Sequence, residues 1–213
     1  MATFLTLRAP EPRDAQPLWA RLLDDRAGRA LDGPLYGAPV VLGSQLAAGF
    51  GGVVQLDVDP RSLPAHTAVR YDLLPWPEEL VDALALELVA PRVVFTGVGV
   101  QRAIDAGHGV GLDADVDAGQ AADFLSLLAH TEVGFVARAA NAAGVLQVVA
   151  ATVAALRGDD VRTAWDAPEL ATLLAIPDPA ARALREVLRS IEVPDAVDVA
   201  AALTEAGVGR ARR

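Results

Sequence analysis

Carboxylate and hydroxyl side chains that could handle a phosphoryl group occur at three places in the sequence. Asp57 and Asp59 close a hydrophobic, β-branched run that predicts a buried strand, and Thr96 closes another. Asp159 and Asp160 form an acidic pair directly after a glycine. Hard cations prefer oxygen ligands, and the ends of parallel strands meet at one crevice. Together these residues predict a site for Mg²⁺ and phosphate.

This set of motifs resembles that of the haloacid-dehalogenase-type phosphatases. The resemblance implies that Asp57 is the nucleophile, that Asp59 is the acid/base and that Thr96 binds phosphate. It also implies that Asp57, Asp159 and Asp160 hold Mg²⁺. The resemblance covers isolated tri- and tetrapeptides. The family's phosphate-binding lysine has no counterpart, because all 18 basic residues are arginine.

A second hypothesis concerns the glycines that follow the strand predicted at 92–96. Gly97 and Gly99 could let the backbone approach a dinucleotide pyrophosphate, and Asp113, further along the chain, could hold a ribose. The third glycine of that fingerprint is Arg102. The alternative is that the two glycines form an ordinary tight turn between a strand and a helix.

A third acidic pattern has the 1-3-5 spacing of a calcium-binding loop at Asp113, Asp115 and Asp117. The glycine and the glutamate that such a loop needs are replaced by Ala118 and Phe124. A strand end followed by a helix N-cap at Asp117 accounts for the same residues.

The composition excludes several chemistries. The chain has no cysteine and no lysine, which rules out thiol nucleophiles, cysteine-ligated metals and Schiff-base chemistry. The formal charge of −10 argues against nucleic acid and anionic membrane as partners. No apolar run is long enough to span a bilayer, and the first residues lack the pattern of a secretory signal. We therefore expect a cytoplasmic protein with one domain over residues 1–213.

Hydrophobic periodicity predicts alternating strands and helices followed by a helical region. The predicted strands are 3–8, 53–57, 67–74, 92–96, 109–112 and 132–137. The predicted helices are 16–31, 77–89, 117–129, 141–158, one that begins at 166–169, 178–191 and 195–207. The one at 77–89 is apolar almost all round. This order favours an α/β fold in which a mainly parallel sheet has flanking helices, with a helical C-terminal third over about 141–213.

The C-terminal helices carry features that could mediate self-association. One helix has a row of small residues, and a later helix has a row of arginines. These residues are Ala143, Ala150, Ala151, Ala154 and Ala155, and Arg182, Arg185 and Arg189. Small faces allow close helix approach, and arginine is enriched at interfaces. A core helix and a solvated charged face explain the same pattern.

Two classes of function are consistent with these observations. The first is a ligand-responsive or assembly protein without covalent catalysis, which takes a small-molecule ligand or forms a homo-oligomer through its C-terminal helices. The alternative is a Mg²⁺-dependent hydrolase of a phosphorylated small molecule that uses Asp57 and Asp59. The hydrolase predicts loss of activity in Asp57→Asn, whereas the assembly protein predicts dissociation in Arg185→Glu.

Overall fold

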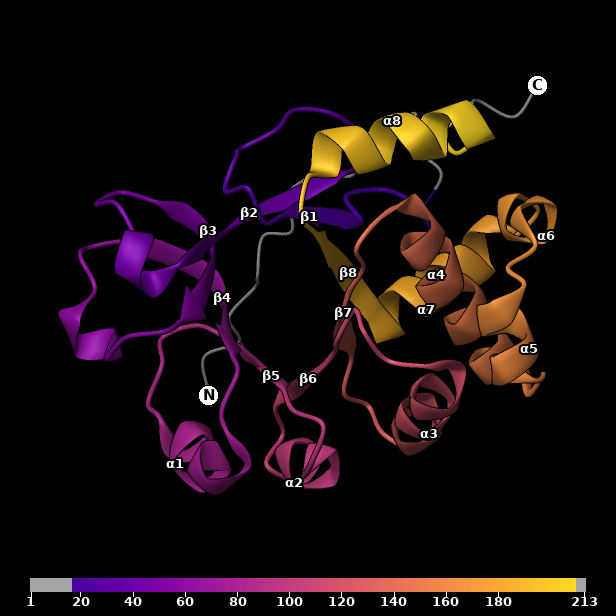
Figure 1. Cartoon of the computed structure of the whole chain (residues 1–213). Coiled ribbons are helices and arrows are strands. Elements are labelled where there is room, and N and C mark those ends of the chain that lie inside the picture. The colour runs from indigo at the N-terminus through magenta and orange to yellow at the C-terminus, as the bar shows by residue number, and fades with distance from the viewer. Residues whose placement is uncertain (1–16, 210–213) are drawn as a thin grey trace.

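Eight parallel strands form a closed barrel in the computed structural model, which describes residues 17–209 (Figure 1). Each strand pairs with its neighbours in chain order, and β1 also pairs with β8, which closes the ring. The strands are β1 Leu23–Asp25, β2 Tyr36–Leu42, β3 Gly51–Leu56, β4 Thr67–Leu73, β5 Arg92–Phe95, β6 Gly109–Leu112, β7 Phe135–Arg138 and β8 Leu188–Val193.

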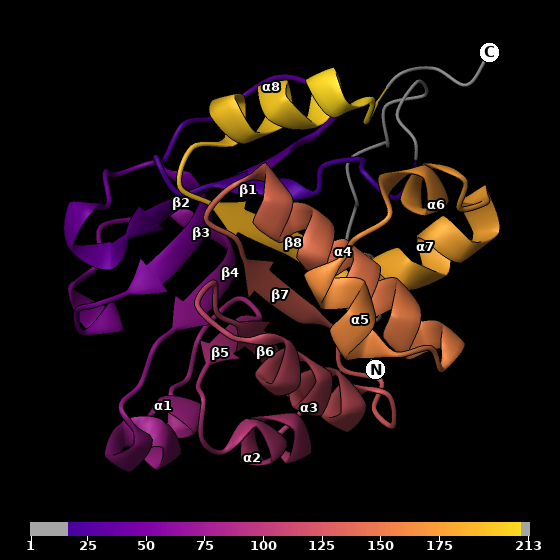
Figure 2. The same cartoon turned by 45° about the vertical axis from the view of Figure 1, so that its right-hand side comes forward.

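Only β4 to β8 are followed by α-helices, so the helical layer covers one part of the barrel (Figure 2). These helices are α1 Leu80–Ala85, α2 Val100–Asp105, α3 Ala118–Leu128, α4 Ala142–Arg157, α5 Val161–Asp166, α6 Leu170–Leu174, α7 Asp178–Val187 and α8 Ala196–Ala206. Short 3-10 turns at Gly43–Gln45 and Pro60–Ser62 follow β2 and β3, and a third at Pro77–Glu79 precedes α1. None of the helices within residues 17–209 is long and apolar enough to cross a membrane.

The predicted mixed α/β class and parallel pairing are confirmed. The prediction of a sheet with flanking helices is wrong in one respect, because the sheet closes into a barrel. The C-terminal third also contains a strand, because β8 occupies Leu188–Val193, where the sequence predicts the end of a helix. Leu188 and Ile191 match helical spacing from Leu184, which explains the error. In the structure Ser190 and Glu192 alternate with the apolar residues of β8, as they do in a strand.

The first described segment also differs from its prediction. A helix is expected over 16–31, but residues 17–21 form a turn and Leu23–Asp25 form β1. Leu18, Leu22 and Leu23 are all buried, so the leucine pattern reports burial rather than helical periodicity. The strand predicted at 3–8 lies outside the described residues.

Local capping signals predict the helix ends well. Asp117 accepts a hydrogen bond from the backbone of Gln120 and begins α3, and Asn141 caps α4 in the same way. Gly158 ends α4 in the left-handed conformation, with φ of 77°. The helix predicted at 77–89 is shorter, because α1 ends at Ala85. Val89 is 95 % exposed, so that segment is not buried all round.

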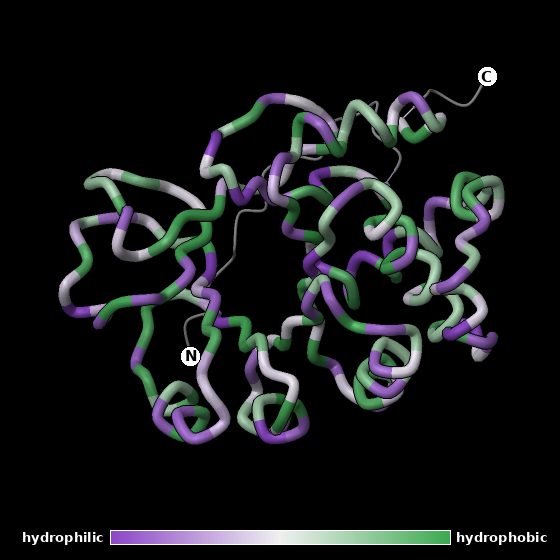
Figure 3. Tube along the Cα trace, in the orientation of Figure 1, coloured by the Kyte–Doolittle hydropathy of each residue, from purple (hydrophilic) through white to green (hydrophobic). Residues whose placement is uncertain are grey.

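The main core lies between the outer wall of the barrel and the helices. Val94, Val110 and Phe135 face this layer from the strands, and Val149 and Leu203 face it from α4 and α8. Inside the barrel, Val93, Phe95 and Val136 form a small separate apolar cluster. Hydrophilic positions occur in the barrel wall as well as on the surface (Figure 3).

The small residues proposed for self-association pack largely within the chain, and so does one arginine of the arginine row. Ala150, Ala151 and Ala154 of α4 are buried in this structure. Arg185 is also buried, and its guanidinium donates to the backbone oxygen of Leu188 at 2.7 Å and to that of Ala20 at 3.4 Å. Arg185 is therefore not an exposed interface residue, and Arg185→Glu would disturb folding instead of dissociating an oligomer.

We expect Arg185→Met to lower the free energy of unfolding by about 1–3 kcal/mol, because it leaves buried carbonyl oxygens without a donor. Chemical denaturation followed by circular dichroism measures this change. Arg182→Met is the matched control, since Arg182 is exposed on the same helix and should change stability by less than about 0.5 kcal/mol. Equal stabilities for the two variants would contradict this role for Arg185.

Candidate functional site

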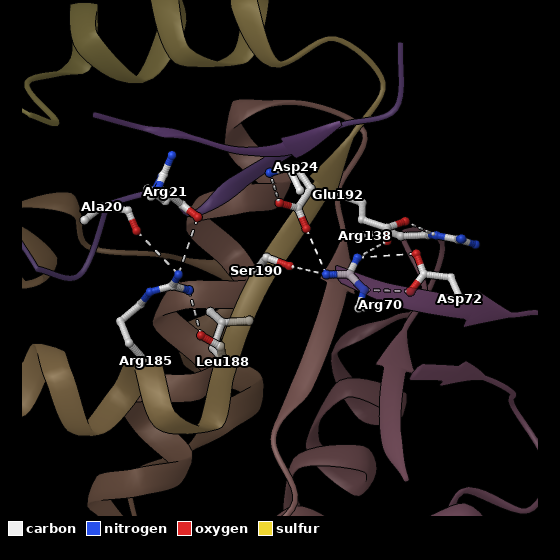
Figure 4. Close-up of polar contacts among 11 residues, drawn as sticks. Ala20, Arg21, Asp24, Arg70, Asp72, Arg138, Arg185, Leu188, Ser190 and Glu192 are labelled. Carbon is white, nitrogen blue, oxygen red and sulfur yellow. Dashed lines mark hydrogen bonds and ion pairs between the residues drawn. The ribbon is translucent and has the colours of Figure 1, made fainter. Parts of the chain in front are cut away.

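Charged side chains fill part of the barrel interior, and Arg70 of β4 is their centre (Figure 4). Its guanidinium lies 3.0 Å from the carboxylate of Asp24 on β1, 2.7 Å from that of Asp72 on β4 and 2.5 Å from that of Glu192 on β8. It also donates to the hydroxyl of Ser190 at 3.0 Å. Arg70 thus ties three strands of the barrel together through one planar group.

Arg138, the last residue of β7, extends this network toward the carboxyl end of the strands. Its Nε donates to Glu192 at 3.0 Å, and its Nη2 donates to Oε1 of Gln55 at 3.0 Å. The guanidinium carbon lies 3.9 Å from the centre of the Phe95 ring, a cation–π contact. Its Nη1 is 3.8 Å from the half-exposed carboxylate of Asp113. Arg138 is therefore held by contacts on several sides, and only 4 % of its surface is exposed.

Glycines at two strand positions make room for this network. A Cβ on Gly37 would lie 2.2 Å from Oδ1 of Asp24, which accepts a hydrogen bond from the backbone of Ala38. A Cβ on Gly111 would lie 2.1 Å from the ring of Phe95. Neither overlap is tolerable, so glycine is needed at both positions for the polar and aromatic groups to sit where they do.

The interior holds more acids than bases. Three buried carboxyl groups, those of Asp24, Asp72 and Glu192, face the two guanidinium groups of Arg70 and Arg138. Burial, together with the neighbouring charge of Asp72, raises the pKa of Glu192 to about 8. Burial alone would lower the pKa of Arg70, but the carboxylates of Asp72 and Asp24 raise it, so Arg70 stays charged. With Glu192 protonated at neutral pH, the carboxylates of Asp24 and Asp72 balance the two guanidinium groups.

A cleft of about 340 Å³ opens beside this network, where the carboxyl ends of β1, β2, β3 and β8 meet. Its lining consists of Arg26, Ala27, Gly28, Val40, Val41, Leu42, Gln45, Gln55 and Pro194. Arg138 has only donors, so Gln55 must present its oxygen to Arg138. The two amide hydrogens of Gln55 then remain for the cleft that this side chain lines.

A second hollow, of about 310 Å³, lies at the carboxyl ends of β5 and β6 and includes the predicted residues Thr96 and Gly97. The hydroxyl of Thr96 donates to the backbone oxygen of Val98 at 2.5 Å. Gly99 begins α2 with φ of 87°, and a Cβ there would lie 2.5 Å from Leu80. Close packing and a left-handed turn thus account for Gly99. Because α2 has only six residues, it offers little dipole to a pyrophosphate.

The predicted phosphatase residues lie at three separate places: Asp57 and Asp59 follow β3, Thr96 follows β5, and Asp159 and Asp160 lie between α4 and α5. Asp57 accepts hydrogen bonds from the backbone and the hydroxyl of Ser44, which lower the pKa of its carboxyl. Asp59 caps the 3-10 turn after β3 by accepting from the backbone of Arg61 at 2.9 Å. Asp160 caps α5, on the far side of the barrel from β3 (Figure 1). Within residues 17–209, no group of three or more histidine, aspartate or glutamate side chains is placed to hold a metal ion.

Sequence reasoning missed the residues that the structure does bring together, namely Gln55, Arg70, Asp72, Arg138 and Glu192. A signal for them was present. Strands of a parallel sheet that are covered on both faces are almost wholly apolar. Polar residues at alternate positions, such as Arg70 and Asp72, therefore indicate a strand with one polar, enclosed face.

The fold and the site define a parallel β/α barrel with a charged interior and a donor-lined cleft at the carboxyl end of its strands, the end where barrels of this architecture carry their functional sites. A scan against protein-family models finds no match, and searches of curated proteins and of solved structures find none either. The site geometry therefore carries the functional argument.

Proposed function

We propose that the protein binds a small anionic ligand, rich in hydrogen-bond acceptors, in the cleft between Arg26, Gln45 and Gln55. The observation that carries this proposal is the orientation of Gln55. Arg138 holds the amide oxygen of Gln55, so the amide hydrogens are left for the cleft, where Arg26 adds a positive charge. A phosphate or carboxylate group accepts hydrogen bonds from such donors.

The composition of the lining supports a negatively charged ligand. The protein has 28 acidic residues and a net charge of −10, yet none of the residues that line this cleft is acidic. Arg26 is the one charged residue of this lining, and a local positive charge favours an anion there although the protein as a whole is acidic. The volume of about 340 Å³ suits a small molecule.

The same lining favours binding over covalent chemistry. It contains no hydroxyl, imidazole or carboxyl side chain that could act as a nucleophile or general base. Glu192 is fully buried behind Arg138 and does not line the cleft. A ligand-responsive protein is therefore the function that the geometry supports best.

Calorimetric titration with inorganic phosphate, ribose 5-phosphate and succinate tests this proposal. We expect at least one of these anions to bind saturably, and Arg26→Ala and Gln55→Leu each to weaken binding about 10-fold or more, since a hydrogen bond to a charged group contributes about 1.5–3 kcal/mol. Arg102→Ala is the matched control, because Arg102 is an exposed arginine outside the cleft. Absence of binding, or an equal effect of Arg102→Ala, would contradict the proposal.

Self-association through the C-terminal helices stays a separate prediction. Arg182 and Arg189 are exposed, and they are the arginines of that row still free to meet a second copy. Sedimentation equilibrium of the wild type and of Arg182→Glu distinguishes a monomer from an oligomer held by this face.

A further inference from the structure

An open groove of about 630 Å³ lies outside the barrel, between the loop that follows β3 and the segment that leads into α1. Most of its lining is apolar, and Leu74 and Trp76 are prominent in it. The charged residues of the lining are all acidic: Asp57, Asp59, Glu79 and Asp82. The groove does not share a lining residue with the cleft proposed above for the anion.

Trp76 is the unusual residue of this groove, because 70 % of its surface is exposed, whereas Trp19 and Trp165 are buried. Leu74 is 40 % exposed and Val58 is 37 % exposed beside it. An exposed apolar surface of this kind on a soluble domain is typical of a contact site.

The backbone at Trp76 is restrained before any partner arrives. It lies between Pro75 and Pro77, whose rings restrict the backbone, and its backbone nitrogen donates to Glu79 at 3.1 Å. The loop opposite is also ordered, because Asp57 is held by Ser44. A surface that is already ordered loses little entropy on binding, which favours affinity.

The charge of the groove selects the partner. Each carboxylate has about four acceptor positions, and the hydrogen bonds that Asp57 and Asp59 accept within the chain use only some of them. A cationic group bound here would meet carboxylates and the face of an indole at once, and a cation over tryptophan gains attraction from both. Arginine has the planar group that stacks on an aromatic ring while it bonds to carboxylates.

We infer that this groove is a docking site for a basic segment of a partner protein in which arginine or lysine alternates with apolar residues. The apolar side chains pack on Leu74 and Val58, and a cationic side chain lies over Trp76. A segment fits better than a small molecule, because the groove is open and cannot enclose the greater part of a small ligand.

Fluorescence anisotropy with a labelled nine-residue peptide of alternating arginine and leucine tests this inference. We expect saturable binding to the wild type, about 10-fold weaker binding to Trp76→Ala, and about 3-fold weaker binding to Asp82→Asn. Val89→Ala and Glu132→Gln are matched controls, since both residues are exposed and lie outside the groove, and each should stay within about twofold of the wild type. Thermal unfolding of each variant verifies that it is folded.

Several results would overturn the inference. One such result is that binding of the arginine–leucine peptide does not saturate. Another is that Trp76→Ala binds the peptide as tightly as the wild type does. A peptide of alternating arginine and serine that binds equally well would show that only general charge attraction operates. Displacement of the peptide by micromolar spermidine, with the same dependence on Trp76, would assign the groove to small organic cations instead of a protein segment.

Discussion

Replacement of Arg70 with leucine is expected to lower the free energy of unfolding by about 3–5 kcal/mol. The guanidinium of Arg70 is the shared partner of Asp24, Asp72 and Glu192. Without it, three carboxyl groups lie close together in the barrel with only Arg138 to balance them. Breaking a buried ion pair by removing one partner is costly, because the remaining charge is neither solvated nor paired.

Urea denaturation at two pH values checks this expectation. The loss should be smaller at pH 5 than at pH 8, because Glu192, which Arg70→Leu leaves with Arg138 alone, is more fully protonated at the lower pH. The double variant Arg70→Leu/Asp72→Asn removes one of those charges and should regain part of the stability, which keeps the test informative if the single variant does not fold. Arg102→Leu, on the surface of α2, is the control. A loss below about 1 kcal/mol that does not change with pH would contradict the role assigned to Arg70.

Replacement of Glu192 with glutamine is expected to remove a large part of the pH dependence of stability. Burial, with the charge of Asp72, raises the pKa of Glu192 from 4.5 to about 8 in the folded chain. In the unfolded chain the carboxyl returns to its ordinary pKa. Between these two values the folded protein holds a proton on Glu192 that the unfolded protein does not, so folding takes up a proton.

The sign of the effect follows from this proton. Stability from Glu192 is fully present below about pH 4.5 and is lost as the pH rises toward 8, at about 1.4 kcal/mol for each unit of pKa shift. The loss for the wild type between pH 5 and pH 9 should therefore exceed that for Glu192→Gln by on the order of 3–5 kcal/mol. Glutamine resembles the protonated acid in shape, and its one amide oxygen can still accept from either Arg70 or Arg138.

Denaturation midpoints of both chains at pH 5, 7 and 9 measure this difference. Every other titrating group is common to the two chains and cancels in the comparison. Parallel pH profiles for the wild type and Glu192→Gln would contradict the raised pKa of Glu192. Glu87→Gln, at an exposed position, is the control and should follow the wild type throughout.

The parts of the fold that could be predicted from the sequence are those decided by neighbouring residues. Asp117, Asn141 and Gly158 set helix ends through hydrogen bonds within a few positions, so their effects are visible in the sequence. β3 and β5 each contain a short apolar run, and β4 alternates apolar with polar residues, so both patterns are also local. β1 and β8 were missed because their state depends on pairing with each other across the whole chain, which no local pattern reports.

The candidate site was missed for a related reason. Asp57, Asp59 and Thr96 stand at strand ends and match known motifs. In the structure Asp59 and Thr96 bond within their own loops, and Asp57 bonds to Ser44 in the turn after β2. Arg138 and Glu192 come from strands far apart in the sequence, and they become a pair only when the barrel closes. Residues that gain their chemistry from closure carry no motif of their own.

The junction of β1 and β8 has a consequence for how the chain folds. Their paired residues, such as Leu23 and Ile191, are separated by about 170 residues, so joining them costs about 2 kcal/mol more in loop-closure entropy than a contact over 20 residues does. This junction is therefore the step of highest contact order and should form late. Asp25 stabilises it by accepting from the backbone of Ala196 at 2.9 Å, and the cleft of about 340 Å³ spans it from Arg26 to Pro194. A ligand in that cleft would contact residues that follow both β1 and β8. It would therefore slow the separation of these two strands and protect their amides from hydrogen exchange.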